Sequence, residues 1–538
     1  MEAVAPEEVG EASPVTTPAG DEDSGFPAAV RRTVAGWRNG GVGHRAAVAA
    51  AAVSVLLLLL LAVRLPWAGD LGIHAATVDR LRTDLTDPGD PLVKADVDSP
   101  YFSPWMLTLA VLARVTGLAT FTVLRFAALV GLVLVVTGVG HFTRTFTRHR
   151  AAVPLAVLSV LFLQGWTAFA WSGFPGLLSL GLCLAYPSTL AIGIAFHLWA
   201  LLRKGLERRW GWGPFLWLGL LLGAQMLIHQ FTGLVTVLGL LAILLGARPW
   251  PERATWLRVG AGCAVALALV LAWPYYSFFS LLSAGNLNPI HRALYQHLWS
   301  HYGLVLLGVA ALALRLRRDR RDPLVLFFVL GAVPFALGGL THQWAWARVL
   351  PAVMLPAQIA LAVEVTRVRG TRWARASFAA VTAVVLLAGA WAQAGTLNYV
   401  LRPQALPSSL ADRPYPKPWP SVTWAAHYVR PGQVVMTGDY YVLRMLPAYG
   451  PYTVESAYPD FFLPDEQQRA DATKRYFAAH TTPAQRAAIL AHYGVRWVVA
   501  PVGYHGLATD PSLVAKATDP AHRLRLYEVR STAGARAE

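Results

Sequence analysis

Apolar stretches recur along the chain from residue 46 to residue 394, and short polar segments separate them. An α-helix needs about 20 mainly apolar residues to cross the hydrocarbon core of a bilayer. The pattern therefore predicts about eleven membrane-spanning helices. We place them at residues 46–65, 126–142, 151–167, 184–202, 260–276, 302–314, 324–340, 349–366 and 377–394, with two more within 213–247.

The segment 213–247 is a double-length apolar run that is interrupted by His229, Gln230 and Phe231. Two short spans joined by a tight turn would fit this pattern, and so would a re-entrant loop. Both alternatives return the chain to the same side of the membrane, so the placement of the later loops does not depend on the choice.

Arg-rich clusters between the apolar stretches predict the orientation of the chain in the membrane. They lie at residues 31–45, 144–150, 203–209, 248–258, 315–321 and 367–375. Cytoplasmic loops retain Lys and Arg, so all of these clusters are expected on the cytoplasmic side. The short apolar segment 105–118 would reverse every later loop if it crossed the membrane. We therefore expect it to lie on the outer surface as an interfacial helix.

The parts outside the spans predict three further regions. Residues 1–45 are acidic and then basic, which indicates a disordered cytoplasmic tail with a basic segment next to the membrane. The membrane domain then covers 46–395, with a first outer loop at 66–125. Residues 396–538 combine turn residues, strand-like runs and a helical stretch, which is typical of a small α/β domain. The span count places this C-terminal domain outside the cell.

Composition supports a polytopic α-helical membrane protein of the plasma membrane. Hydrophobic residues make up 55% of the chain and charged residues only 14%, whereas soluble domains carry about 25% charged residues. The formal net charge of +16 would suit a nucleic-acid partner, but the Arg residues lie at the ends of spans and do not form one basic face. We therefore exclude nucleic acid. Abundant Arg and Ala beside scarce Lys indicate a GC-rich bacterial genome.

Asp70 is the main catalytic candidate. It follows the first span by a few residues, at the start of an amphipathic helical segment in which His74 would share its face. A carboxylate at the membrane surface can take a proton from a hydroxyl group. The alternative is that Asp70 only caps the helix that follows it. Asp96 and Asp98, later in the same outer loop, are weaker candidates for substrate binding, because most carboxylates there are expected to be solvated.

Arg348 is the main candidate for binding an anion. It ends the outer turn 341–348, which also contains His342, a further candidate for substrate binding. A guanidinium group at the outer interface can bind a phosphate through two hydrogen bonds, although an interfacial Arg can also simply extend toward water. His229, between the two short spans, can line a polar cavity or serve only as a helix terminus.

The arrangement of these residues resembles the GT-C glycosyltransferases, which are polytopic membrane enzymes. A single span, an outer loop that opens with Asp70, an interfacial helix and a late outer Arg348 carry the resemblance. It implies transfer of a sugar from a polyprenyl-phosphate donor to a cell-envelope glycan, lipid or protein acceptor, by a hexosyl- or pentosyltransferase. Asp70 would be the catalytic base and Arg348 would meet the donor phosphate. An actinobacterial cell-envelope enzyme would suit the composition.

The sequence departs from the family pattern in its acidic residues. Many members have an adjacent acidic pair or a second acid in the next outer loop, but Leu71 follows Asp70 and the loop 167–186 contains no acid. This favours a single Asp base, with no metal and no other cofactor. Two other functions stay open: a transporter or flippase of lipid-linked sugars, and a non-enzymatic envelope assembly protein.

Overall fold

A computed structural model of the chain describes residues 41–283, 288–367, 371–504, 506–519, 521 and 523–530. The expected N-terminal tail therefore lies outside the described residues, except for its last few positions. Those positions already belong to the first described helix, α2, which begins at Val42.

The membrane half is a bundle of apolar helices. Their bounds are α2 (Val42–Arg64), α5 (Thr120–Arg144), α6 (Ala152–Phe162), α8 (Pro187–Glu207), α9 (Trp212–Ile228), α10 (Gln230–Leu245), α11 (Arg253–Leu271), α14 (Leu306–Arg318), α15 (Pro323–Leu340), α16 (Pro351–Arg367) and α17 (Arg372–Ala392). Within the described part of the chain, eight helical segments are long and apolar enough to cross a membrane, and α6, α9 and α10 are shorter apolar helices. The polytopic helical fold is thus confirmed, while the count of eleven spans stays a prediction.

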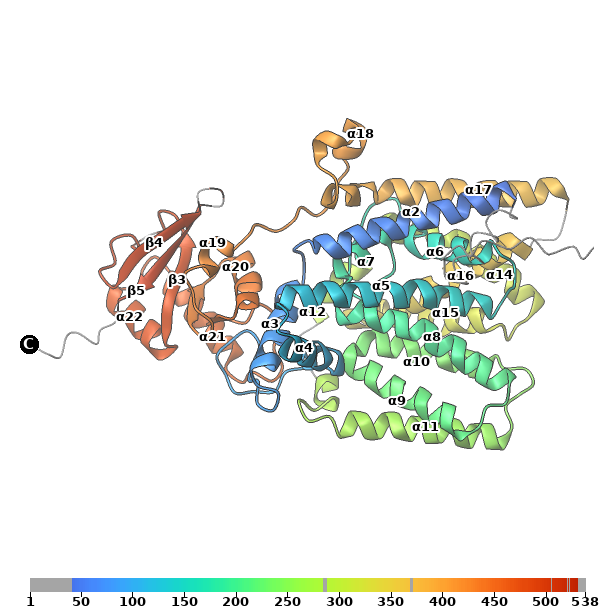
Figure 1. Cartoon of the computed structure of the whole chain (residues 1–538), viewed down its shortest axis with the longest axis horizontal. Coiled ribbons are helices and arrows are strands. Elements are labelled where there is room, and N and C mark those ends of the chain that lie inside the picture. Colours follow the sequence, from blue (N-terminus) through green and yellow to red (C-terminus); the bar gives the residue numbers. More distant parts are fainter. Residues whose placement is uncertain are drawn as a thin grey trace, which may run out of the picture.

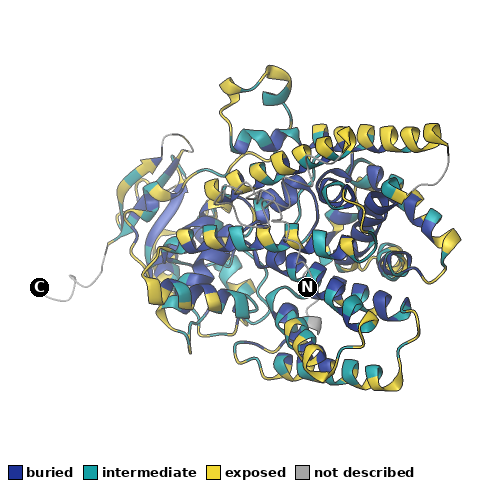
Figure 2. Ribbon diagram, turned by 45° about the vertical axis from the view of Figure 1, so that its right-hand side comes forward, coloured by how far each residue is buried: buried dark blue, intermediate teal, exposed yellow. Residues whose placement is uncertain are grey.

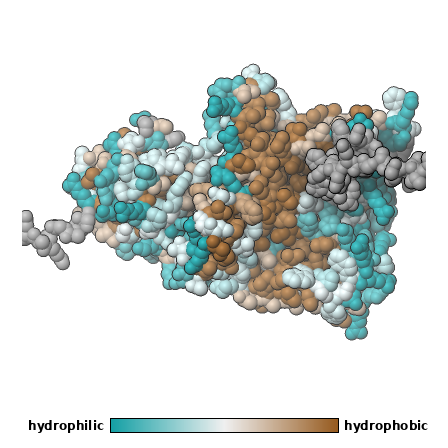
Figure 3. Space-filling model, in the orientation of Figure 1, coloured by the Kyte–Doolittle hydropathy of each residue, from teal (hydrophilic) through white to brown (hydrophobic). Residues whose placement is uncertain are grey.

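The bundle has two distinct ends. Its helices run roughly side by side, and the C-terminal domain lies at one end, which we call the domain end (Figure 1). The helix termini that carry Arg144, Arg367 and Arg372 lie at the opposite end. A hydrophobic band crosses the surface between the two more polar ends (Figure 3). This band has the location that a bilayer would cover.

Two helices of the first loop lie at the domain end, beside the C-terminal domain (Figure 1). They are α3 (Leu71–Thr83) and α4 (Pro104–Thr116), and α4 packs on α3. Ser103 caps α4, because its hydroxyl oxygen accepts a 3.3 Å hydrogen bond from the backbone N–H of Met106. The structure thus gives the segment 105–118 a helix at the end of the bundle, and its location on the membrane surface stays a prediction.

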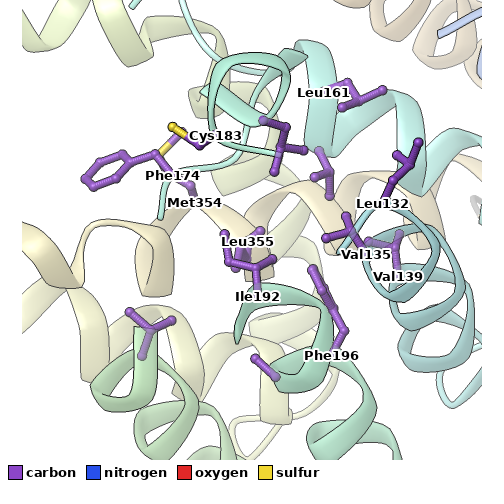
Figure 4. Packing of buried hydrophobic residues seen from close by; sticks show 14 of the residues in the cluster. Leu132, Val135, Val139, Leu161, Phe174, Cys183, Ile192, Phe196, Met354 and Leu355 are labelled. Carbon is purple, nitrogen blue, oxygen red and sulfur yellow. The ribbon is translucent and has the colours of Figure 1, made fainter. Parts of the chain in front are cut away.

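Buried apolar side chains hold the bundle together. Leu132, Val135 and Val139 of α5 face Ile192 and Phe196 of α8 (Figure 4). The interior of the molecule is buried, whereas the outer helices carry many exposed positions (Figure 2). Those exposed positions are largely apolar along α17, where only 17% of the most apolar window is buried. The outer faces therefore suit contact with lipid.

A network of ion pairs closes the opposite end of the bundle. The Arg315 guanidinium lies 2.6 Å from a carboxylate oxygen of Asp322 and 3.1 Å from one of Glu364. Arg318 also contacts Glu364, at 2.6 Å. Glu364 is completely buried. Because a buried charge is costly without a partner, these contacts explain how an acidic residue is accommodated near the end of α16.

The C-terminal domain contains a five-stranded mixed sheet in the order β2-β1-β3-β5-β4. The strands are β1 (Val434–Thr437), β2 (Tyr452–Thr453), β3 (Val495–Pro501), β4 (Leu513–Asp519) and β5 (Leu524–Val529). β1 is parallel to β2 and β3, while β5 is antiparallel to β3 and β4. The main helices of the domain are α20 (Tyr440–Met445), α21 (Glu466–Phe477) and α22 (Pro483–His492). Helices separate β1, β2 and β3, whereas β3, β4 and β5 follow one another directly, and the small C-terminal α/β fold is confirmed.

Short helices complete the connections. They are α7 (Leu177–Cys183), α12 (Asn288–His291), α13 (Leu298–Tyr302), α18 (Ser408–Ala411), α19 (Thr423–Ala426), and the 3-10 segments η1 (Phe279–Ser283), η3 (Arg292–Tyr295), η4 (Gly303–Val305), η5 (Trp344–Val349), η6 (Ala394–Tyr399), η7 (Pro403–Ala405) and η8 (Leu446–Tyr449).

The first loop is fastened to the C-terminal domain. The buried guanidinium of Arg80, in α3, donates 2.8 Å hydrogen bonds to the carbonyl oxygens of Gly450 and Pro451. Val93 pairs in parallel with Thr453 of β2 and so extends the sheet beyond its edge. The loop that carries Asp70 is thus held between the membrane bundle and the C-terminal domain.

Candidate functional site

Asp70 occupies the position before the first residue of α3, but its side chain makes no capping hydrogen bond. Gly69 precedes it with a φ of +51°, a conformation that glycine adopts readily. The hydroxyl of Tyr186 donates to the carbonyl oxygen of Ala68, and that of Tyr458 donates to the carbonyl oxygen of Gly69 at 2.9 Å. The backbone before Asp70 is therefore fixed by two tyrosines, while its carboxyl group stays available for another task.

The surroundings of Asp70 shift its proton affinity. Burial raises the pKa of the Asp70 carboxyl, while the positive charges of Arg348 and Arg444 and a hydrogen bond with Tyr458 oppose that shift. Burial dominates because it penalises the charged form of the carboxyl. A carboxyl with a raised pKa holds a proton more tightly than a solvated one, which is the property that a general base needs.

His74 lies one helical turn after Asp70, as the spacing predicts. It is buried, and its ring packs edge-on against Tyr186 at 4.7 Å and Tyr101 at 6.1 Å between ring centroids. Burial lowers the pKa of His74 to about 3, so its ring is neutral at physiological pH. Its buried Nδ1 atom has no hydrogen-bond partner among the described residues. A polar atom without a partner at this site suits a hydrogen bond to a bound substrate.

Arg348 comes from η5, at the domain end of the segment that leads into α16. The residue is only 6% exposed, and its guanidinium lies 4.3 Å from the centre of the Phe231 ring. Its Nε atom is buried and has no hydrogen-bond partner among the described residues. Since no described carboxylate pairs with it, Arg348 is a buried cation with free donors. An interfacial Arg that merely extends toward water would be exposed, and this one is not.

His229 lies against Arg348. The ring Nε2 of His229 is 3.3 Å from Nη2 of Arg348, and its Nδ1 accepts a 3.2 Å hydrogen bond from the backbone N–H of Thr232, at the start of α10. With Nδ1 as the acceptor, the proton of the neutral ring lies on Nε2, so two N–H groups face the same small space. The opposite tautomer would let Nε2 accept from Arg348. Only this second tautomer, in which Nδ1–H can donate to the Thr232 hydroxyl at 2.8 Å, lets His229 hold the guanidinium through a hydrogen bond.

Arg348 and His229 line a small pocket together with Thr232, Phe231 and Trp199. Asp70 does not line this pocket, and no ion pair joins it to Arg348 among the described residues. The two groups nevertheless lie close enough for the charge of Arg348 to act on Asp70, and the thiol of Cys183 lies within range of both. Asp70 and Arg348 therefore influence each other electrostatically without forming an ion pair.

Comparison with solved structures finds a similar fold in two membrane proteins. The chain matches the arabinofuranosyltransferase AftD from Mycobacteria with a TM-score of 0.54 and 17% identity, over 92% of this chain and 40% of AftD. It matches ArnT from Cupriavidus metallidurans, solved with undecaprenyl phosphate, with a TM-score of 0.51 and 15% identity, over 90% of this chain and 98% of ArnT. The chain has the overall fold of these two proteins, which agrees with the fold expected from the resemblance to GT-C glycosyltransferases. No protein-family model and no curated protein matches its sequence.

The C-terminal domain contributes residues to the Asp70 site that sequence reasoning missed. Tyr458 contacts Asp70 and the preceding residue, and the positive charge of Arg444, in α20, acts on the same carboxyl. The guanidinium of Arg444 lies 5.0 Å from the centre of the Tyr458 ring. Both residues are more than 370 positions away from Asp70 in the sequence. No local motif marks them, because only the docking of the two domains brings them to the site.

The other candidates lie apart from Asp70 and Arg348. Asp96 and Asp98 are exposed in the first loop, and His342 is exposed with its ring 5.0 Å from that of Trp344. No contact described for these three residues brings them to Asp70 or Arg348, so their role in substrate binding stays a prediction. Across the described ranges, no group of three or more His, Cys, Asp or Glu side chains is placed to hold a metal.

Proposed function

We propose that this protein transfers a sugar from a polyprenyl-phosphate donor to a hydroxyl group of a cell-envelope acceptor at the outer face of the plasma membrane. The observation that carries this proposal is that the buried Arg348, which has no carboxylate partner among the described residues, acts electrostatically on Asp70, a carboxyl with a raised pKa. One group suits a leaving phosphate and the other suits an attacking hydroxyl. The ligand of the structurally similar ArnT, undecaprenyl phosphate, supports a donor of this class.

In the proposed reaction, the oxygen of an acceptor hydroxyl forms a bond to the anomeric carbon of the donor sugar. The bond between that carbon and the phosphate oxygen breaks, and the polyprenyl phosphate leaves with the electron pair. Asp70 takes the hydroxyl proton. The leaving phosphate gains negative charge, and Arg348, held by His229, stabilises that charge as it develops. The positive charge thus comes from the chain itself, and the proposed mechanism uses no metal or other cofactor.

The test uses the full chain in lipid nanodiscs with a set of radiolabelled polyprenyl-phosphate pentoses and hexoses. We expect release of polyprenyl phosphate from one of them, with kcat reduced at least about 100-fold in Asp70→Asn, which cannot accept the proton. Asp79→Asn, in the same helix, is the matched control and should retain activity. Full activity of Asp70→Asn would refute the role of Asp70.

The same assay separates the alternative functions. A flippase would move the labelled lipid across the membrane without releasing polyprenyl phosphate. An assembly protein would do neither, and Asp70→Asn would then affect nothing but stability. We expect cleavage of the donor, and its absence with every donor in the set would refute the proposal.

A further inference from the structure

Two exposed tyrosines and the half-buried Trp419 form an aromatic cluster at the surface of the C-terminal domain. The ring of Trp419 lies 5.6 Å from that of Tyr440 and 5.5 Å from that of Tyr441, and the two tyrosine rings are 5.3 Å apart. Tyr440 is 53% exposed and Tyr441 is 38% exposed. We call these three residues the aromatic cluster. Large aromatic side chains grouped at the surface in this way are characteristic of binding sites.

Hydrogen bonds fix the backbone that carries the aromatic cluster. The carboxyl of Asp439 caps α20 by accepting hydrogen bonds from the backbone N–H groups of Tyr441 and Val442, at 3.0 and 2.9 Å. The backbone N–H of Trp419 donates to the carbonyl oxygen of Trp67, at 3.3 Å, in the segment that leads to Asp70. Because this backbone is already ordered, the cluster loses less conformational entropy when a ligand binds than it would on a flexible loop.

A continuous row of contacts joins the aromatic cluster to the catalytic candidate. The guanidinium of Arg444 lies 3.8 Å from the centre of the Tyr440 ring and 5.0 Å from the centre of the Tyr458 ring. Tyr458 in turn contacts Asp70 and Gly69. The row therefore starts at exposed rings on the C-terminal domain and ends at the carboxyl group that would activate the acceptor hydroxyl.

We propose that the aromatic cluster and Arg444 form a subsite for an oligosaccharide acceptor, whose terminal sugar reaches Asp70 while the preceding sugars lie over the rings. This proposal rests on the proposed glycosyl transfer. A sugar ring has an apolar C–H face, which packs on the electron-rich face of an aromatic ring. It also has an edge of hydroxyl groups, which can accept from guanidinium donors and donate to phenol oxygens. The cluster offers both kinds of partner side by side.

The test compares Trp419→Ala and Tyr440→Ala with Tyr428→Ala, in the full chain in nanodiscs. Tyr428 is a matched control on the same domain, because it is 44% exposed and its ring contact is with His427. The probes are neutral arabinan, galactan, mannan and glucan tetrasaccharides and the corresponding monosaccharide octyl glycosides. The measured quantity is kcat/KM for the tetrasaccharide divided by kcat/KM for the monosaccharide, for the glycan that the protein accepts. We expect this ratio to fall about 10-fold in both cluster variants. Tyr428→Ala should leave the ratio unchanged.

The opposite results would overturn the subsite. An unchanged ratio in both cluster variants would show that the rings do not bind the acceptor. If kcat/KM fell equally for the tetrasaccharide and the monosaccharide, the rings would have a role in folding only.

A separate measurement distinguishes failure of this subsite from failure of the proposed function. If the unmodified chain cleaves no donor, binding of the tetrasaccharides is measured directly by saturation-transfer NMR. Binding that disappears in Trp419→Ala would support the glycan subsite even though the transfer reaction had been refuted. Absence of binding by every tetrasaccharide would overturn the subsite itself.

Discussion

Gly72 in α3 and Arg444 in α20 approach so closely that a Cβ atom on Gly72 would lie 1.7 Å from the carbonyl oxygen of Arg444. Such a distance is far below van der Waals contact, and the obstacle is backbone, so one of the two helices would have to move. The contact joins the helix that begins after Asp70 to the helix that carries Arg444. It therefore makes the geometry of the site depend on how the two domains pack.

Gly72→Ala should disrupt this contact. We expect a large loss of sugar transfer, together with faster hydrogen exchange of the backbone in α20, because α3 and α20 must separate. Gly260→Ala is the matched control, since a Cβ atom at Gly260 in α11 would meet nothing within 4 Å. Normal activity and exchange in Gly72→Ala would show that the two helices can adjust without consequence for the site.

The pH dependence of the reaction should follow the carboxyl of Asp70. Its pKa is raised by burial, so the base should become protonated, and kcat/KM should fall, at a pH above the ordinary aspartate value of about 3.9. Tyr458 and Arg444 both favour the carboxylate. Tyr458→Phe and Arg444→Met should therefore raise the pKa further and move the acid limb of the pH–rate profile to higher pH.

The control for this profile is Arg475→Met, which removes an exposed positive charge on α21, away from the site. It should leave the acid limb in place. A shift to lower pH in Tyr458→Phe or Arg444→Met would contradict the assignment of Asp70 as the titrating base.

Arg348 and His229 should act on the donor rather than on the acceptor. We expect Arg348→Lys to lose most of the activity, because an ammonium group cannot reproduce the two parallel hydrogen bonds of a guanidinium to a phosphate. His229→Ala should weaken donor binding by about 10-fold, or roughly 1.4 kcal/mol, since it frees the guanidinium to move. The measurement is the KM for the polyprenyl-phosphate sugar. Arg114→Ala, an exposed residue of α4, is the control.

Chelation of divalent cations should leave the activity intact, because Arg348 supplies the positive charge that the leaving phosphate needs. The measurement is the rate of polyprenyl phosphate release before and after treatment with EDTA. Activity that disappears with EDTA and returns with Mg²⁺ or Mn²⁺ would contradict a mechanism without a metal.

The ion pairs at the opposite end of the bundle should matter for stability. Glu364→Gln leaves the buried Arg315 without one of its two carboxylate partners, and we expect a loss of about 3–5 kcal/mol in the free energy of unfolding. Glu207→Gln removes a more exposed pair with Arg203, whose side chains are 24% and 55% exposed, and should cost at most about 1 kcal/mol. Thermal unfolding in detergent compares the two variants.

Most of the fold could be predicted from the sequence because the membrane imposes a simple pattern. Apolar runs predict the helices, and the Arg clusters predict on which side of the membrane each connecting loop lies. The segment 105–118 could therefore be assigned to the end of the bundle without a structure. The ambiguous run 213–247 forms two helices, α9 and α10, which meet at His229. The sequence could not decide this, since both alternatives have the same hydrophobic pattern.

The site could be predicted only in part. Asp70 and Arg348 stood out because each is a charged residue at an unusual position relative to a span. The helix-cap alternative for Asp70 required coordinates, because only they show that its carboxyl makes no capping bond. Arg444 and Tyr458 could not be found, since their proximity to Asp70 arises from packing between regions that are distant in sequence. Asp96, Asp98 and His342 have side chains that could bind a substrate, but a single sequence does not show that these side chains are exposed.

The pairing of Val93 with Thr453 has a consequence for the order of synthesis. The edge of the sheet at β2 is covered by Val93 of the first loop, which is synthesised before the C-terminal domain. The first loop is therefore present when the C-terminal domain folds, and the domain can pair with it. A C-terminal domain produced alone would carry an open strand edge, of the kind that promotes aggregation. We therefore expect the first loop to protect this strand edge while the C-terminal domain folds.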